Sequence, residues 1–135
     1  MREVSVLLVD DEPNICWAIK ALLRPPRYRL LSLNSGSEAL SRLQHESFER
    51  IIVDAKLQDM NGLDLARRIR LLNPEAWIVL ISAFYYSDDQ TVTAALSEGS
   101  IQRFVAKPFS HQALLDALDP EPPVAEGSDD PLASR

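Results

Sequence analysis

Several features that proteins use for cross-linking, metal binding or membrane anchoring are scarce in this sequence of 135 residues. Cys16 is the single cysteine, which excludes an internal disulfide and a cysteine-based metal cluster. His45 and His111 stand alone on expected helices, where an exposed or capping role is favoured over metal binding. The chain has no uninterrupted apolar run of about 18 residues and no signal-peptide pattern, so we expect a cytoplasmic protein that does not contact a membrane.

Basic side chains are also in the minority, since 14 lysines and arginines stand against 20 aspartates and glutamates, for a formal charge of −6. Five acids and one arginine after residue 118 carry −4 of this, which leaves the preceding part with about −2. Direct nucleic-acid binding by this segment is disfavoured, because a phosphate backbone requires a basic stripe. We interpret the cluster of Arg67, Arg68 and Arg70 as a solvated helix face.

The composition changes at Asp119 to Pro, Glu, Asp, Ser and Gly. Such a segment cannot bury enough apolar area to offset the entropy of ordering. We therefore expect one folded domain over residues 1–118 and an acidic, proline-rich linker or disordered tail over residues 119–135. A linker of this composition favours a longer regulator in which a further domain follows.

What the sequence does contain is a fivefold alternation of short apolar runs with segments of helical periodicity. This alternation is typical of a parallel sheet covered by helices on both faces, and it predicts an α/β fold. The expected strands are Val4–Val9, Tyr28–Leu33, Ile51–Asp54, Trp77–Ser82 and Phe104–Lys107.

Capping residues and apolar spacing indicate the helices between these strands. Pro13 marks the start of the first helix, and Ser35 with Glu38 forms a capping box for the second. Asp88 and Ser110 are predicted to cap the fourth and fifth helices. The expected apolar faces are Ile15, Ala18, Ile19 and Leu22 in the first helix, Leu65, Ile69 and Leu72 in the third, Val92, Ala95 and Leu96 in the fourth, and Leu114, Leu115 and Leu118 in the fifth.

Polar residues stand where four of these strands end, namely Asp10 and Asp11, Asp54, Ser82 and Lys107. The carboxyl ends of parallel strands share one edge of a sheet, so these residues are expected to form one site. Three carboxylates in one crevice repel each other unless a cation neutralises them, and oxygen ligands favour Mg²⁺. Asp54 would attack phosphorus as a carboxylate nucleophile, while Lys107 and the Ser82 hydroxyl stabilise the transferring group.

These residues also carry a resemblance to a known family. Over roughly residues 3–118 the chain resembles the CheY-like receiver domains of two-component response regulators. The segments that carry the resemblance are Leu7-Leu8-Val9-Asp10-Asp11-Glu12-Pro13, Asp54 with Met60-Asn61-Gly62, Ile81-Ser82-Ala83, and Phe104-Val105-Ala106-Lys107-Pro108-Phe109. The resemblance implies a doubly wound five-stranded parallel sheet of flavodoxin-like order 2-1-3-4-5, with helices on both faces. It also implies that Asp54 is the phosphate acceptor, and that Asp10, Asp11, Asp54 and the backbone carbonyl of Lys56 bind Mg²⁺.

The family further implies a switch. Ser82 is expected to move toward the phosphoryl group, Phe104 is the aromatic that rotates inward, and the Lys107–Pro108 peptide is expected to be cis. A sensor histidine kinase or phosphotransfer protein would supply the phosphoryl group. The altered face of the fourth helix, fifth strand and fifth helix would control an output domain or a protein partner. Homodimerisation through that face occurs in the family and stays open here.

Two departures from the family pattern affect loops. Gln58 replaces the usual proline four residues past the acceptor, and Leu57 replaces the usual methionine, which predicts a more mobile loop after Asp54. The segment from Gly99 to Phe104 is one residue longer than in the commonest receivers, so we expect the fourth helix to end differently.

The aromatic run Phe84, Tyr85 and Tyr86 follows Ser82, where local loop packing is favoured over partner contact. Phe84 and Lys56 are nevertheless expected to flank the mouth of the phosphate site and limit attacking water. The acyl phosphate would then be long-lived.

Simpler interpretations exist for single residues: Asp11 as a cap of the first helix, Ser82 in a turn hydrogen bond, and Lys107 in a surface ion pair. None of them explains why all of these residues stand at strand ends. The leading hypothesis is a signalling module whose chemistry is limited to self-phosphorylation and autodephosphorylation.

A Mg²⁺-dependent phosphohydrolase with an aspartyl-phosphate intermediate is the enzyme alternative. Lys56 disfavours it, because the haloacid-dehalogenase-like pattern has an acid two residues past the nucleophile. An unphosphorylated docking module with the same fold is the second alternative. Loss of an acid or of the lysine would favour that module, and none is lost.

Overall fold

The computed structural model describes residues 2–85 and 89–120, in which five strands and five helices alternate. The strands are β1 (Val4–Val9), β2 (Tyr28–Leu33), β3 (Arg50–Asp54), β4 (Trp77–Ser82) and β5 (Arg103–Ala106). The helices are α1 (Pro13–Leu22), α2 (Gly36–Leu43), α3 (Gly62–Leu72), α4 (Gln90–Glu98) and α5 (His111–Ala117). The predicted tail beyond residue 120, Tyr86 and the predicted cap Asp88 lie outside the described residues. No described helix is long and apolar enough to cross a membrane.

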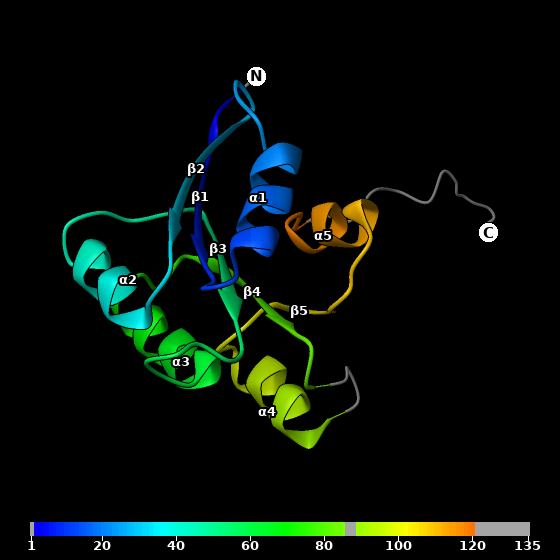
Figure 1. Cartoon of the computed structure of the whole chain (residues 1–135). Coiled ribbons are helices and arrows are strands. Elements are labelled where there is room, and N and C mark those ends of the chain that lie inside the picture. The colour runs from blue at the N-terminus through cyan, green and yellow to red at the C-terminus, as the bar shows by residue number, and fades with distance from the viewer. Residues whose placement is uncertain (1, 86–88, 121–135) are drawn as a thin grey trace, which may run out of the picture.

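The strands form one parallel sheet in the order β2-β1-β3-β4-β5 (Figure 1). The register places Val9 beside Val53 and Asp54 beside Ile81, so the strands end together at one edge. The predicted doubly wound fold and its strand order are confirmed. Because consecutive parallel strands require crossovers, residues far apart in the sequence reach the same edge.

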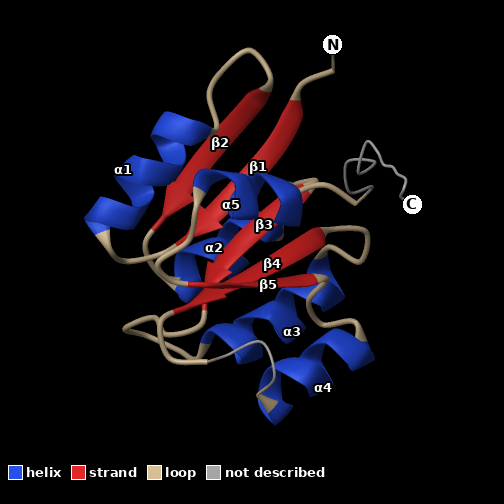
Figure 2. Cartoon of the chain, turned by 90° about the vertical axis from the view of Figure 1, so that its right-hand side faces the viewer, coloured by secondary structure: helices blue, strands red, loops and turns tan. Residues whose placement is uncertain are grey.

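Helices cover both faces of the sheet (Figures 1 and 2). On one face of the sheet, Ile19 of α1 and Leu114 of α5 pack against the aliphatic side chains of the strands. On the other face, α2, α3 and α4 cover the strands, and Leu65 of α3 is one of the buried side chains there. Successive residues of β1 alternate between the two layers, with Leu7 in one and Leu8 in the other. Burial on both faces explains why this strand is aliphatic throughout, and each fully buried leucine contributes roughly 2 kcal/mol.

Helix caps agree with the sequence in two cases and differ in a third. The Ser35 hydroxyl accepts a hydrogen bond from Glu38 N at 3.2 Å, and the Ser110 hydroxyl accepts one from Ala113 N at 3.0 Å. The cap of α4 is Asp89, which accepts from Thr91 N at 2.8 Å, one residue after the predicted cap. Two adjacent aspartates satisfy the same local pattern, so only the backbone path distinguishes them.

Some strand ends differ by one residue from the prediction, and two predicted faces were wrong. β3 begins at Arg50 and β5 at Arg103, each one residue before the prediction, because ladder pairing extends to a polar residue that an apolar pattern does not include. β5 ends at Ala106, one residue before the predicted end. Leu72 and Leu96 were expected on apolar faces but are 41% and 38% exposed. The α4 C-cap is Gly99, whose φ of 82° is left-handed and therefore suits glycine.

Candidate functional site

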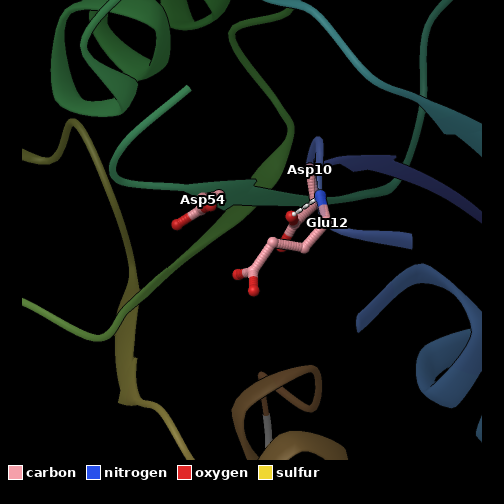
Figure 3. A group of neighbouring side chains, drawn as sticks. All are labelled: Asp10, Glu12 and Asp54. Atoms are coloured by element: carbon pink, nitrogen blue, oxygen red, sulfur yellow. Dashed lines mark hydrogen bonds between the residues drawn. The ribbon is translucent and has the colours of Figure 1, made fainter. Parts of the chain in front are cut away.

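A group of carboxylates gathers where the neighbouring strands β1 and β3 end. Asp10 follows β1 and Asp54 ends β3, directly after the paired Val9 and Val53. Asp10 is fully buried and Asp54 is 5% exposed. One carboxylate oxygen from each of Asp10, Glu12 and Asp54 lies within 4.8 Å of the others (Figure 3). Adjacent parallel strands therefore bring together acids that are more than forty residues apart in the sequence.

Lys107 places an ammonium group among these acids. Its backbone nitrogen donates to Ser82 O at 2.7 Å, which holds the residue at the end of β5. Its Nζ lies 2.6 Å from Glu12 Oε1 and 3.4 Å from an oxygen of both Asp10 and Asp54. The Lys107 side chain is only 8% exposed and its partners Asp10 and Asp54 are buried, although Glu12 is 57% exposed. Lys107 is therefore not in the surface ion pair that is its simpler interpretation.

The cluster opens into one cavity of about 390 Å³. Its lining includes Asp11, Glu12, Asp54, Lys56, Phe84 and Lys107. Asp11, Asp54 and Lys107 thus face a shared space, as the sequence predicts for a single site. Phe84 and Lys56 both line this space, and Lys56 Nζ lies 4.6 Å from the centre of the Phe84 ring.

Burial and mutual charge alter the proton affinities in the cluster. Burial raises the pKa of Asp10 to about 6, with a further increase from the Asp54 charge, although the Glu12 amide and Lys107 oppose it. Burial also raises the pKa of Asp54 against the opposing charge of Lys107. Burial by itself lowers the pKa of Lys107, but the hydrogen bond that its ammonium group donates to Glu12 and the charges of the two aspartates outweigh burial, and the net shift is upward.

The donor set fits a divalent cation. Three carboxylates face one ammonium ion, which leaves an excess of negative charge in a largely buried space. The available ligand atoms are hard oxygens, and no histidine or cysteine is among the three residues of this group. Such a set suits Mg²⁺, which takes a few carboxylates and keeps several waters.

Asp11 does not cap helix α1. The N-cap of α1 is Glu12, which makes no side-chain cap hydrogen bond. Asp11 Oδ2 instead accepts from Gln58 N at 2.9 Å, in the loop between β3 and α3. The capping interpretation of Asp11 was therefore wrong, and the loop that was expected to be more mobile is tied to the β1–α1 connection.

The two predicted switch residues, Ser82 and Phe104, are not among the residues that line the cavity. Ser82 is fully buried, and its hydroxyl accepts hydrogen bonds from Phe84 N at 2.9 Å and Tyr85 N at 3.1 Å. Ser82 thus makes the turn hydrogen bonds that are its simpler interpretation. Phe104 is partly buried and packs on the face covered by α2, α3 and α4. The Lys107–Pro108 peptide is cis, as predicted.

Two residues at the site were not assigned a role from the sequence alone. Glu12 belongs to the carboxylate cluster, and the signal for it was the third consecutive acid after β1. Gly62 begins α3 directly against the end of β3, where its amide donates to Ala55 O at 2.7 Å. A Cβ atom at this position would lie 2.1 Å from Asp54 O, so only glycine lets the helix start so close to Asp54.

Comparison with known proteins agrees with this geometry. Residues 6–119 match the family model described as "Response regulator receiver domain". The transcriptional regulatory protein ZraR of Klebsiella oxytoca is 30% identical over 84% of this chain but only 25% of its own length. The chain thus spans about a quarter of the length of this curated relative.

Solved structures agree as well. The signal receiver domain of an HD domain-containing protein from Pseudomonas fluorescens is 32% identical, with a TM-score of 0.76 over 87% of this chain and 92% of that one. The BeF₃-activated receiver domain of Thermotoga maritima DrrB is 28% identical, with a TM-score of 0.73 over 84% and 92% of the two chains. This chain therefore belongs to the receiver-domain family of response regulators, signalling modules that are phosphorylated on an aspartate in two-component systems.

Proposed function

We propose that Asp54 accepts the phosphoryl group, which a sensor histidine kinase or phosphotransfer protein donates. The observation that carries this proposal is the position of Asp54 in the shared cavity, with Lys107 Nζ 3.4 Å from its carboxylate. An Asp54 oxygen forms a bond to phosphorus while the bond between phosphorus and the donor nitrogen breaks. The donor nitrogen then takes up a proton, and Lys107 offsets negative charge on the phosphoryl oxygens.

The same residues would hold Mg²⁺. Asp10, Asp11, Asp54 and the backbone carbonyl of Lys56 are the proposed ligands, and Glu12 lies within the same cluster. When bound, the cation would neutralise the carboxylates and the phosphoryl oxygens during transfer. Burial raises the pKa values of Asp10 and Asp54, so a bound cation would offset the cost of keeping both buried carboxylates ionised.

The hydrogen bonds of Ser82 support a switch at this site. Its hydroxyl holds the amides of Phe84 and Tyr85, so movement toward a phosphoryl group on Asp54 would release the start of the β4–α4 connection. Phe104 is the proposed aromatic partner in this change, and the α4–β5–α5 face is the proposed output surface. The similar DrrB receiver domain has been solved in a BeF₃-activated form, so an activated state exists for that relative.

The relatives support the proposed partners of the domain. Curated relatives such as ZraR are transcriptional regulators about four times as long as the matched part, which supports control of an output domain or a protein partner. The proposed receiver segment is not itself expected to bind nucleic acid. Homodimerisation through the α4–β5–α5 face is a habit of the family, and no observation on this chain decides it.

The proposed function is tested by metal removal. The protein is incubated with a small-molecule phosphodonor in Mg²⁺ or in EDTA, and its intact mass is measured. We expect a gain of one phosphoryl group with Mg²⁺ and at least a tenfold lower yield in EDTA, because the carboxylates then repel the incoming phosphate. Equal labelling in EDTA would contradict a metal-assisted site, and peptide mapping would identify the acceptor residue.

The Phe84–Lys56 pair is expected to protect the phosphorylated state. Removing the ring in Phe84→Ala opens the cavity mouth to water, so we expect phosphate loss to accelerate by about threefold. The rate is measured by intact mass after the phosphodonor is removed. Leu71→Ala is the matched control, since Leu71 is an exposed apolar side chain on α3 outside the cavity lining. Faster loss from the wild type than from Phe84→Ala would contradict the prediction.

A further inference from the structure

The Asp11 carboxylate is held apart from the acidic cluster that it adjoins. Asp10 and Glu12, its neighbours in the chain, both contribute to the group of oxygens within 4.8 Å that includes Asp54, but Asp11 does not. Asp11 nevertheless lines the same cavity. Its Oδ2 is occupied by the backbone N–H of Gln58, at 2.9 Å. A backbone amide on another loop therefore determines where this carboxylate lies.

The loop that carries the Gln58 amide is anchored on both sides of it. Leu57 is buried, and its nitrogen donates to Met60 O at 3.3 Å. Asp59 accepts from Gly36 N and from the following residue of α2, both at 3.0 Å, and these bonds lower the pKa of Asp59. Packing and hydrogen bonds on either side thus determine the direction of the Gln58 N–H. The bond from this N–H to Asp11 is therefore not a chance contact of a surface side chain.

Residue identity at position 58 decides whether this bond can exist. Every residue type except proline has a backbone N–H, and glutamine therefore supplies a donor that proline would lack. An N–H donated to a carboxylate is among the stronger hydrogen bonds in proteins, because the acceptor is ionised. Because Asp11 is not in the group of oxygens that lie within 4.8 Å of one another, it has to move toward that group to share a cation with Asp54, and this movement pulls its Oδ2 away from the Gln58 amide.

We propose that the Gln58 backbone amide is a positioning group that holds Asp11 outside the carboxylate cluster, so that it competes with a divalent cation for this carboxylate. The inference rests on the proposed function, since it takes Asp11 as a cation ligand. It adds that position 58 sets how tightly this receiver domain binds Mg²⁺, and through this how readily Asp54 is phosphorylated at limiting Mg²⁺.

Two variants isolate the backbone amide. Gln58→Pro and Gln58→Ala both lose the glutamine side chain, but only the proline variant loses the N–H. Affinity for Mg²⁺ alone is measured by isothermal titration calorimetry, without any phosphodonor. We expect Gln58→Pro to bind Mg²⁺ about fivefold more tightly than Gln58→Ala, because only the alanine variant has to give up the hydrogen bond to Asp11 when Mg²⁺ binds. Equal affinities, or weaker binding by Gln58→Pro, would overturn the inference.

A second measurement uses the wild type and does not depend on the folding of Gln58→Pro. Hydrogen exchange of the Gln58 amide is followed by NMR with and without saturating Mg²⁺. We expect exchange at least threefold faster with Mg²⁺, because the amide has then lost its acceptor. Unchanged or slower exchange would refute the competition. Failure of the wild type to bind any Mg²⁺ would instead refute the proposed function, whereas Mg²⁺ binding with equal affinities of the two variants refutes this inference alone.

Discussion

Asp54→Asn is expected to abolish incorporation of a phosphoryl group, at least a hundredfold below the wild-type yield, when the protein is incubated with Mg²⁺ and a small phosphodonor. The carboxamide is neutral and is a poor nucleophile toward phosphorus. It also loses the charge that attracts Lys107 Nζ, which lies 3.4 Å from the Asp54 carboxylate. The substitution is close to isosteric, so the strand end against Gly62 should keep its packing.

Asp64→Asn is the matched control for this measurement. Asp64 is an exposed aspartate in the first turn of α3 and does not line the cavity. We expect this variant to be labelled to the same extent as the wild type, as judged by intact mass. Equal labelling of Asp54→Asn and wild type would show that another carboxylate is the acceptor and would refute the assignment of Asp54.

Asp10→Asn is expected to stabilise the domain by about 1–3 kcal/mol at pH 7 in EDTA. Asp10 is fully buried, and its pKa in the folded state is raised to about 6 from an ordinary value of 3.8. The native state therefore resists ionisation of this group at neutral pH. Asparagine resembles the protonated acid, and its side-chain oxygen can still accept the Glu12 amide that Asp10 binds at 2.8 Å.

The pH dependence of this difference has a definite sign. Well below pH 3.8, the ordinary pKa of the group, Asp10 is protonated in both the folded and the unfolded state, so wild type and Asp10→Asn should be equally stable. Between about 4 and 6 the folded state binds more protons than the unfolded state. Wild-type stability therefore falls relative to Asp10→Asn as pH rises through about 6. Urea unfolding in EDTA at several pH values measures the difference, with the exposed Asp64→Asn as the control. A wild type that is more stable than Asp10→Asn at pH 7 would contradict the prediction.

Much of the candidate site was predictable because it depends on strand ends. Asp54 and Lys107 each follow a run of apolar residues, and in a parallel sheet such positions converge whatever the detailed packing. The same reasoning did not identify Glu12 as a member of the cluster, since its side-chain direction depends on how the chain leaves β1. The movement of Ser82 toward a phosphoryl group stays a prediction, and the structure adds that its hydroxyl now binds the amides of the β4–α4 connection.

Sequence periodicity by itself determined the α/β class, because strands that are buried on both faces are aliphatic. It also determined the edge of the sheet at which the acids and the lysine meet, because these residues stand at the ends of parallel strands. The family resemblance added the strand order. Only the tertiary structure decided the bond between Asp11 and the Gln58 amide, which joins loops 47 positions apart in the chain. Every residue but proline carries the same backbone N–H, so its direction and its acceptor follow from the three-dimensional path of the loops and cannot be inferred from residue identity.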